Sequence, residues 1–376
     1  MTRTPTRVPT NSHTQNLGST SERSEAAQTK AKPGTAQRPR RGLDVPRSSV
    51  TAPDGLLIVD KPAGVTSHDV VAAVRRLAST RKVGHAGTLD PMATGVLVIG
   101  IGKATRLLTH IVGADKAYSA TVQLGVSTDT DDAEGAVVAM KGSHALENQE
   151  SIDEFEDAVE AELNKLRGEI MQVPTTVSAI KIDGERAHAL HRAGEKVDIP
   201  ARPVTISRLE RTSEIKSRIV SIDEEDVAVN SFDMDVECSS GTYVRAIARD
   251  LGKALGTGGI LTRLRRTRVG KWTLDHAVTI EDLVANVEGQ AGEAAGGAEP
   301  IPVISLTQAC VEQFASLDLE YEEAEAMRHG NVTRLRPRTP DGEIAACLWD
   351  GSVRALVKRA DDRYEPVVVF ATGPLD

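Results

Sequence analysis

The chain has 376 residues, of which 40% are hydrophobic, a length and composition that support a large core and favour two domains over one. Its formal net charge of −9 argues against a protein that coats nucleic acid, although an acidic enzyme can still carry a local basic groove. Three scattered cysteines, no apolar run of about 18 residues and no signal-peptide pattern exclude a disulfide framework and a membrane span, so we expect a cytoplasmic protein.

The N-terminal segment differs in composition from the rest of the chain. Residues 1–50 hold nine Lys or Arg against three Asp or Glu, with almost no periodic apolar positions. Such a segment cannot recover the entropy lost on ordering, so we expect residues 1–52 to form a disordered basic arm. A solvated leader explains this composition better than an RNA-binding tail, although both fit it.

Residues 53–285 are predicted to form a mixed α/β (α+β) domain. The run Leu56–Val59 predicts a buried strand, Pro62–Gly64 a turn, and Thr66 or Ser67 the cap of a helix. Further strands are expected at GVLVIGIG, KAYSATVQLG and FDMDVEC. Helical periodicity continues in SIDEFEDAVEAELNKLRG and in a helix that begins near Tyr243.

A change of composition marks the end of this domain. Residues 286–300 are rich in Gly, Ala and Glu and lack periodicity, so we expect a linker there. The remaining residues, 301–376, predict a short helix at Tyr321–His329 and brief strands near 344–348, 353–357 and 367–370. This pattern is consistent with a small β-barrel.

Several segments resemble cofactor-binding or metal-binding motifs but lack a required residue or spacing. GIGKAT has Thr105 where a dinucleotide-binding loop needs its third glycine. DTDDAEG, residues 129–135, places Ala133 at a calcium-ligand position and its glycine one place late. The histidines have no metal-ligand spacing with nearby acids, so we expect neither metal nor cofactor.

One carboxylate has an unusual setting. In GHAGTLDPMATGVLVIGIGKATRL, Asp90 follows a small-residue turn and precedes Pro91 and an apolar strand, with no second acid in the segment. A nucleophilic carboxylate benefits from such a rigid mount, because small displacements at a reacting centre slow the reaction. From these residues alone, however, a turn or capping aspartate is the commoner interpretation.

Five motifs resemble one family. LLIVDKPAGVTSHDVV, VGHAGTLDPMATGVLVIGIGKATR, KAYSATVQLGVSTDTDDAEG, QVPTTVSAIKIDGERAHALHRAGEKV and CSSGTYVRAIARDLG…LRRTRVG follow the order and spacing of the TruB family of bacterial tRNA pseudouridine-55 synthases. The resemblance covers about residues 54–285. Residues 303–370 are more weakly similar to the PUA-type RNA-binding domain. The resemblance implies a pseudouridine synthase catalytic domain on a largely antiparallel sheet and a C-terminal PUA-like β-barrel.

The resemblance also implies the site residues. Asp90 would be the catalytic nucleophile, Arg245 its ion-pair partner, and Tyr118 a ring that stacks on the uracil and helps to remove the C5 proton. Tyr243 and Leu264 would complete the pocket wall. The carboxylate either adds to uracil C6 or expels uracil from C1′, and the sequence fits both routes.

Further residues would bind the RNA. His85 would fill the space left when the target base leaves its stack. Phosphates would be held by basic residues, which are Lys61, Lys181, Arg263, Arg265, Arg266 and Arg268. His188 departs from the family pattern, which usually has an aromatic residue there, most often tyrosine.

These observations predict a tRNA pseudouridine(55) synthase, an isomerase that acts as a monomer on the T stem-loop of tRNA, with no membrane or protein partner. The first alternative is a non-catalytic tRNA-binding or tRNA-folding protein of the same fold. The second alternative, from another class, is an Asp-dependent hydrolase. Incubation with unmodified tRNA, followed by mapping of pseudouridine, discriminates among the three.

Overall fold

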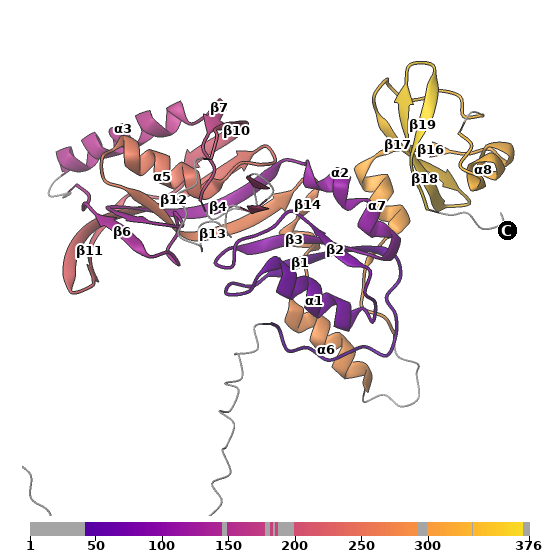
Figure 1. Cartoon of the computed structure of the whole chain (residues 1–376), viewed down its shortest axis with the longest axis horizontal. Helices are drawn as coiled ribbons and strands as arrows, with labels where there is room; N and C mark the ends of the chain where they lie inside the picture. Colours follow the sequence, from indigo (N-terminus) through magenta and orange to yellow (C-terminus); the bar gives the residue numbers. More distant parts are fainter. Residues whose placement is uncertain are drawn as a thin grey trace, which may run out of the picture. The chain divides into compact units, whose positions relative to one another are not determined.

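The computed structural model describes residues 42–144, 149–176, 181–182, 185–186, 199–291, 299–332 and 334–370 (Figure 1). None of the helices in these ranges is both long and apolar enough to cross a membrane. The described α-helices are α1 (Ser67–Leu77), α2 (Leu108–Val112), α3 (Gln149–Lys165), α5 (Val244–Ala254), α6 (Ile280–Ala291), α7 (Leu306–Gln313) and α8 (Tyr321–Arg328). Two short 3-10 helices are η1 (Gly102–Arg106) and η2 (Leu274–His276).

A large twisted sheet forms the centre of the fold. Its main path is β15-β1-β3-β13-β4-β12-β10-β7, with β2, β11 and β14 paired at its sides. These strands are β1 (Gly55–Lys61), β2 (Val83–Ala86), β3 (Thr94–Ile101), β4 (Lys116–Leu124), β7 (Gly168–Gln172), β10 (Arg202–Arg211), β11 (Lys216–Ile222), β12 (Glu225–Cys238), β13 (Gly259–Val269), β14 (Trp272–Thr273) and β15 (Ile304–Ser305). Two short hairpins lie outside the sheet, β5 (Val126–Thr128) with β6 (Val137–Met140), and β8 (Lys181–Ile182) with β9 (Glu185–Arg186).

The pairing within the large sheet is antiparallel except where β13 runs parallel to β3. A mixed fold on a largely antiparallel sheet, as expected from the sequence, is therefore confirmed. The single parallel junction matters for function, because it brings the start of β3 beside the middle of β13, at Thr94–Arg265 and Gly95–Arg266. The segment that carries Asp90 leads directly into this junction.

The apolar strands β1 and β3 are buried on both faces. Leu57, Val59, Leu97 and Ile99 pack against α1 and α6, whereas the alternate residues Leu56, Ile58, Val96 and Val98 pack on the opposite face with Trp272 and Ala309. Since successive strand residues point to opposite faces, burial of both faces requires a continuous apolar run, which GVLVIGIG supplies. Helices α3 and α5 cover the part of the sheet built from β4, β12 and β13 (Figure 1).

The helix α1 begins as the sequence predicts. Thr66 is its N-cap, its side chain accepts from the Asp69 N–H, and the Asp69 carboxylate accepts from the Thr66 N–H in return. Val70, Val71, Val74 and Leu77 face the core. Ser67, the other predicted cap, instead turns its hydroxyl toward the backbone of Leu89.

Two expected boundaries are wrong. Residues 42–52 are not part of a disordered arm, because Val45 and Ala52 are buried against α1 and Arg76 Nε donates to the Val45 carbonyl at 2.8 Å. The linker does not begin at residue 286, since α6 continues to Ala291. Val287 extends the apolar stripe of Ile280, Leu283 and Val284 by one turn and packs into the same core.

The C-terminal residues form a smaller sheet. Its order is β16-β17-β18-β19, with β16 (Ala315–Asp318), β17 (Ile344–Trp349), β18 (Ser352–Ala360) and β19 (Arg363–Val369). The predicted helix and three strands are present, and β16 adds a parallel edge strand that the sequence analysis did not anticipate. No pair between β16 and β19 closes this sheet within the described residues, so the described strands form an open sheet and not the expected barrel.

Candidate active site

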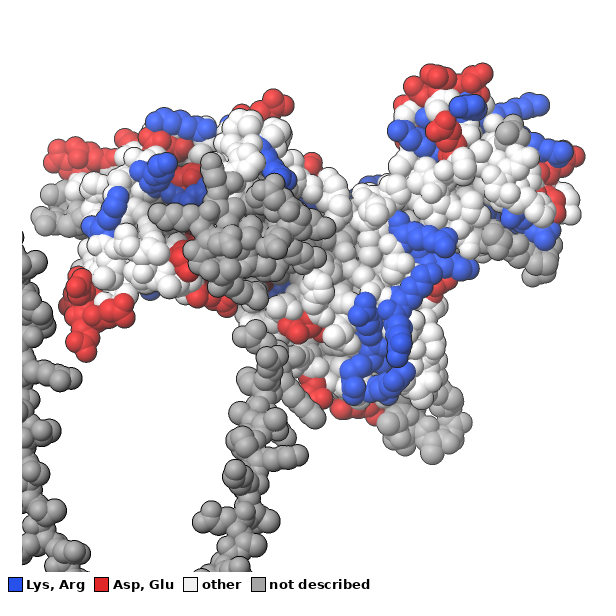
Figure 2. Space-filling view, viewed as in Figure 1, with Lys and Arg blue, Asp and Glu red and all other residues white. Residues whose placement is uncertain are grey.

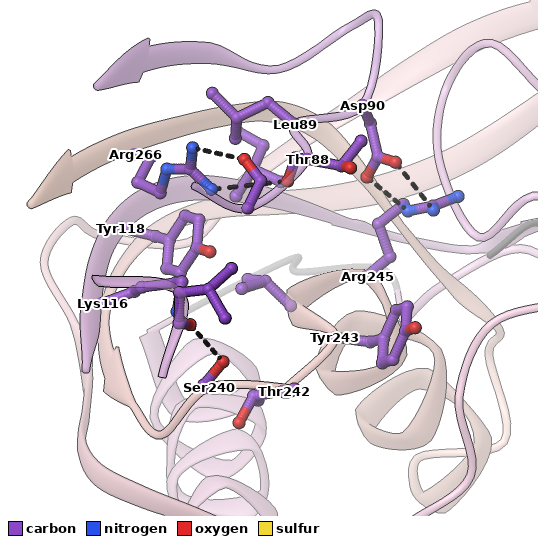
Figure 3. A pocket seen from close by; sticks show the side chains of 15 residues that line it. Thr88, Leu89, Asp90, Lys116, Tyr118, Ser240, Thr242, Tyr243, Arg245 and Arg266 are labelled. Carbon is purple, nitrogen blue, oxygen red and sulfur yellow. Dashed lines mark hydrogen bonds and ion pairs between the residues drawn. The ribbon is translucent and has the colours of Figure 1, made fainter. Parts of the chain in front are cut away.

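A pocket of about 270 Å³ lies where the segment 87–90 faces β4, β13 and the start of α5 (Figure 3). Asp90 and Arg245 stand at one end of it, and Tyr118 and Lys116 stand at the other (Figure 3). Elements far apart in sequence meet here because β4 and β13 are neighbours in the sheet and α5 packs on β13. The pocket is lined by Gly87, Thr88, Leu89, Asp90, Val112, Lys116, Tyr118, Ser240, Gly241, Thr242, Tyr243, Val244, Arg245, Leu264 and Arg266.

The segment that carries Asp90 is fixed by side chains from β1 and α1. The buried Ser67 hydroxyl accepts from the Leu89 N–H at 2.9 Å and lies 3.2 Å from the Leu89 carbonyl. The carbonyl of Pro91 accepts from the Gly64 N–H at 2.9 Å and from Lys61 Nζ at 3.2 Å. Both residues that flank Asp90 are therefore anchored, which restricts the position of the carboxylate.

Arg266 fixes the same segment from the side of the sheet. Its Nε donates to the Val96 carbonyl at 2.7 Å, and its two terminal nitrogens donate to the Gly87 and Thr88 carbonyls at 3.2 and 3.4 Å. Gly95 allows this close approach, because a Cβ there would lie 2.2 Å from the Arg266 carbonyl oxygen and its φ is +102°. Only glycine therefore fits at position 95, where β3 and β13 pair.

Asp90 and Arg245 form a two-point ion pair. Arg245 Nε lies 3.0 Å from Asp90 Oδ2, and Arg245 Nη2 donates to Asp90 Oδ1 at 3.1 Å. The remaining nitrogen, Nη1, donates to the Thr130 carbonyl at 2.6 Å and to Asp132 Oδ2 at 3.0 Å. The Arg245 side chain is only 4% exposed, whereas that of Asp90 is 33% exposed toward the pocket. The guanidinium thus orients a carboxylate that remains open to a ligand.

Asp132 is in turn held by its own loop. Its Oδ1 accepts from the Thr130 hydroxyl at 2.6 Å and from the Glu134 N–H at 3.0 Å. These contacts leave Oδ2 directed at Arg245. The DTDDAEG motif, which fails as a calcium loop, therefore supplies the carboxylate that completes the partners of Arg245.

The charges in the site act on Asp90 in opposite directions. Burial raises the pKa of Asp90 above its ordinary value, and the Asp132 carboxylate raises it further. Arg245 and, more weakly, Lys61 lower the pKa of Asp90. A partly desolvated carboxylate next to a fixed cation is poorly hydrated yet oriented, which suits a nucleophile.

The other residues of the expected pocket are present at its walls. Tyr118 on β4 is 8% exposed, and Leu264 on β13 is 5% exposed. Tyr243 is the N-cap residue of α5, and its backbone is clamped by Gln172, whose side chain accepts from the Tyr243 N–H at 2.8 Å and donates to its carbonyl at 3.1 Å. The pocket thus combines aromatic and aliphatic walls with one exposed carboxylate.

His85 lies just before the Asp90 segment, on β2, and is half-buried. Its ring packs edge-on against His68 on α1, with 5.5 Å between centroids, and its Nδ1 is buried without a hydrogen-bond partner among the described residues. Burial lowers the pKa of His85, and His68 lowers it further, which favours the neutral imidazole. A neutral planar ring is suited to contact with bases.

The structure corrects the expectation that Lys61 and Arg266 hold phosphates. Lys61 is fully buried, and its Nζ donates to the carbonyls of Pro62, Val65 and Pro91. Arg266 is 1% exposed and also donates to carbonyls. Neither side chain reaches a phosphate on the RNA backbone, because Lys61 is enclosed by protein and the Arg266 guanidinium, although it lines the pocket, is buried against backbone carbonyls.

The remaining basic residues have different surroundings. Arg263 is 48% exposed and pairs with Asp233, Arg265 pairs with Asp60 through two contacts of 2.7 and 3.0 Å, and Arg268 pairs with Glu237. The three stay candidates for phosphate contact. The side chain of Lys181 and all of His188 lie outside the described residues.

Three residues of the site were missed or misjudged by sequence reasoning. The sequence places Asp132 only in a failed calcium loop and Lys116 only within a predicted strand, and it predicts Arg266 as an RNA contact. Lys116 is buried, and its Nζ donates to the carbonyls of Val112 and Ala114 at 3.0 and 2.7 Å, at the end of α2. A signal existed for Lys116, since a lysine two residues before Tyr118 shares its strand face.

Comparisons with known proteins agree with this geometry. Residues 75–244 match the N-terminal domain of TruB family pseudouridylate synthases, residues 245–295 match the tRNA pseudouridylate synthase B C-terminal domain, and residues 314–371 match the tRNA pseudouridine synthase II C-terminal domain. Two curated relatives are named tRNA pseudouridine synthase B. That of Arthrobacter sp. (strain FB24) is 50% identical and covers 84% of this chain and 96% of the relative. That of Mycolicibacterium paratuberculosis is 47% identical and covers 86% of this chain and all of the relative.

Solved structures share the fold. A chain in a Cbf5–Nop10–Gar1 complex has a TM-score of 0.58 at 22% identity, covering 88% of this chain and 93% of that chain. A chain in an H/ACA ribonucleoprotein bound to a substrate RNA has a TM-score of 0.57 at 22% identity, with 84% of each chain covered. Together with the matched domains and the relatives of about half-identical sequence, the oriented Asp90 in its pocket leads to one conclusion: this chain belongs to the TruB family of pseudouridylate synthases.

Proposed function

We propose that the protein converts a uridine in the T loop of tRNA to pseudouridine, with Asp90 as the nucleophile. The observation that carries this proposal is the two-point pair of Asp90 with the buried Arg245, in a pocket whose opposite end is formed by Tyr118. The relatives named tRNA pseudouridine synthase B support tRNA as the substrate.

The reaction requires one nucleophile and one proton acceptor from the protein. The C1′–N1 bond breaks, the uracil turns, C1′ bonds to C5, and C5 then loses its proton. Asp90 either adds to C6 or attacks C1′, and its exposed oxygens face the pocket in both cases. In this proposal Tyr118 stacks on the uracil and accepts the C5 proton, while Tyr243 and Leu264 form part of the wall; all three residues line the pocket.

The uridine must leave its stack to enter this pocket. Extrusion costs a few kcal/mol, which contacts to the emptied site can offset. The half-buried, neutral His85 lies five residues before Asp90 and is our candidate for this contact. Arg263, Arg265 and Arg268 on β13 are our candidates for nearby phosphate contacts.

The surface charge also favours RNA. Between Val70 and Val112 the chain contains six Lys or Arg residues and a single acid, Asp90. On the face shown in Figure 2, basic side chains form a continuous strip over α1, β2 and η1, while acidic side chains gather near α3 and β11. A basic strip on an otherwise acidic protein matches a polyanionic ligand. The exposed basic residues of these elements are Arg75, Arg76, Arg81, Lys82, Lys103 and Arg106.

We propose further that the C-terminal residues 301–370 act as a PUA-like RNA-binding unit, since a mixed four-stranded sheet with exposed arginines follows the catalytic domain. We propose that the enzyme acts as a monomer, since a single chain supplies both Asp90 and its ion-pair partner Arg245. We place it in the cytoplasm, where tRNA is modified in bacteria.

Incubation with unmodified tRNA tests this function. We expect pseudouridine at one T-loop position, mapped by chemical modification and primer extension. Tight tRNA binding without pseudouridine would instead indicate the non-catalytic RNA-folding alternative, and the absence of both would contradict the proposal.

A further inference from the structure

Arg266 and Tyr118 are direct cross-strand partners. Tyr118 on β4 lies opposite Arg266 on β13 in the antiparallel ladder, so their side chains share one face of the sheet. Both line the pocket, and Figure 3 shows the Arg266 guanidinium beside the Tyr118 ring. The cation is therefore a neighbour of the phenol by the register of the sheet.

The charge of Arg266 is not neutralised by a carboxylate. Its three nitrogens donate to the carbonyls of Gly87, Thr88 and Val96, and no Asp or Glu of the described residues lies within ion-pair distance of it. At 1% exposure, a guanidinium without a counter-charge is an unusual component of a protein interior. Carbonyl oxygens satisfy its N–H groups, but its full positive charge remains available to an anion beside it.

A second cation lies at the same end of the pocket. A Cβ on Gly87 would be 3.7 Å both from Arg266 Nη1 and from Lys116 Cε, so these two side chains flank one glycine. Burial lowers the pKa of Lys116 to about 8, and Arg266 lowers it as well. The one carboxylate that lines the pocket, Asp90, is at the far end and is paired with Arg245. The Tyr118 end is therefore positive, and it has no resident anion among the described pocket residues.

We propose that Arg266 is a positioning residue of the reaction, which stabilises the phenolate form of Tyr118 so that the phenolate oxygen can take the C5 proton. This inference rests on the proposed function, since it assigns the ionic state of a group within that site. It also gives the buried guanidinium a role other than the phosphate contact that its burial prevents.

The proton transfer balances as follows. After C1′ has bonded to C5, the C5–H bond breaks, its electron pair forms the C5=C6 double bond, and the proton passes to the Tyr118 oxygen. If Asp90 is bonded to C6, this shift releases its carboxylate; if it is not, the electrons of the N1=C6 bond move to N1. N1 gains a proton from solvent and the phenol later returns one, so that no proton is consumed overall.

Of the charged and titratable groups around the Tyr118 phenol, some raise its pKa and others lower it. Burial raises the pKa of Tyr118, and Arg266 lowers it by charge and by hydrogen bonding. Cys238 on β12 and Asp90 also raise the pKa of Tyr118. The other ionisable side chains that line the pocket are Lys116 on the same strand and Arg245 on α5. Arg266 is thus the main group that opposes burial in this pocket.

The test compares wild type, Arg266→Lys and Arg266→Gln in single-turnover reactions with saturating enzyme and unmodified tRNA, across pH 6 to 10. We expect the rise of the rate with pH to move to higher pH in both variants, and more in Arg266→Gln. Since a pKa increase of about one unit reduces the phenolate fraction about tenfold, the rate at neutral pH falls by about tenfold or more. The Kd for tRNA stays within about threefold, because Arg266 does not contact the RNA.

A double-mutant cycle separates this role from a structural one. If Arg266 acts through the Tyr118 hydroxyl, Arg266→Lys lowers the rate much less in the Tyr118→Phe background than in wild type, and any loss that remains there reports its contacts with the Gly87 and Thr88 carbonyls. A matched control is Arg211→Lys, which removes a partly buried guanidinium on β10 that pairs with Glu156 on α3, outside the pocket, and should leave the pH profile unchanged. Circular dichroism and Tm establish that each variant is folded at the temperature used.

A measurement without RNA provides the second readout. The tyrosinate absorbance of wild type minus that of Tyr118→Phe gives the Tyr118 titration directly, and we expect the same difference to appear at higher pH when both proteins carry Arg266→Lys. An unchanged titration, or equal losses of rate with and without the Tyr118 hydroxyl, would overturn the proposal. A wild-type rate for Tyr118→Phe would overturn it too while leaving the Asp90-based function intact, whereas a wild-type enzyme that forms no pseudouridine would contradict that function itself.

Discussion

Asp132 Oδ2 lies 3.0 Å from Arg245 Nη1, on the side of the guanidinium opposite to Asp90. Arg245 is thus held between two carboxylates, one buried at 6% side-chain exposure and one open to the pocket. Because a guanidinium is planar and rigid, fixing one edge of it on Asp132 fixes the other edge for Asp90. The position of the proposed nucleophile therefore depends on a buried residue that is not among those lining the pocket.

This arrangement predicts the effect of Asp132→Asn. The amide cannot hold Arg245 as tightly, so the single-turnover rate should fall by about 10²-fold, as expected of a small misplacement at a reacting centre, with little change in the Kd for tRNA. The matched control is Asp131→Asn, because Asp131 pairs with Arg249 and asparagine tolerates its φ of +61°. A normal rate for Asp132→Asn would show that Arg245 is positioned without Asp132.

The raised pKa of Asp90 predicts how its charge affects stability. A carboxyl whose pKa is higher in the folded state than in the unfolded state binds protons more tightly when folded, so the free energy of unfolding falls as pH rises through that range. Asp90→Asn should therefore have a Tm equal to or above that of wild type at pH 8, and this difference should vanish at low pH, where Asp90 is protonated. Differential scanning calorimetry across the pH range measures it. A Tm deficit at pH 8 that disappears in acid would mean that the pair with Arg245 outweighs burial.

Lys61 should act on stability and not on RNA contact. Lys61→Met leaves the carbonyls of Pro62, Val65 and Pro91 without their ammonium donor, which we expect to lower the free energy of unfolding by about 2–4 kcal/mol in urea titrations. The slope of log Kd for tRNA against log salt should stay at the wild-type value, whereas loss of one phosphate contact reduces it by about 0.7–0.9. The exposed Lys82 offers a control substitution, Lys82→Met, that is expected to leave stability unchanged. A reduced salt slope in a folded Lys61→Met protein would restore the phosphate role.

Two truncations test the N-terminal boundary. Removal of residues 1–41 should leave the single-turnover rate and the Tm nearly unchanged, because their composition lacks apolar periodicity. Removal of residues 1–52 also deletes Val45, Ser48 and Ala52, which are buried against α1, and should lower the Tm by about 5 °C or more. Equal Tm values for the two truncated proteins would show that residues 42–52 do not contribute to the core.

The sequence predicted much of the fold because its elements have local signals. Thr66 and Asp69 cap α1, and the run from Val96 to Ile101 specifies a strand buried on both faces. The boundary errors at residues 42–52 and 286–291 have the opposite origin. In these two segments a few apolar residues, such as Val45 and Val287, suffice because they pack against a surface formed by other parts of the chain. A prediction made from neighbouring residues in the sequence does not include that surface.

The candidate site could be predicted only in part from the sequence, for a similar reason. The family motifs carried Asp90, Tyr118 and Arg245, and the structure brings all three to one pocket. The burial of Lys61 and Arg266 could not be predicted from their charge, since their side chains are held by carbonyl groups 30 to 179 residues away or, for Lys61, in the turn that follows. The contact of Asp132 with Arg245 joins residues 113 positions apart, and no spacing rule in the sequence reports it.

The most direct test of this account is the activity of Asp90→Asn on unmodified tRNA. The substitution keeps the shape of the side chain but removes the nucleophilic carboxylate, so we expect no pseudouridine in a single turnover while the Kd for tRNA stays within about tenfold of wild type. Both quantities are measured on the same preparation, with folding established by circular dichroism. Formation of pseudouridine by Asp90→Asn at a rate near that of wild type would contradict the assignment of Asp90 as the nucleophile.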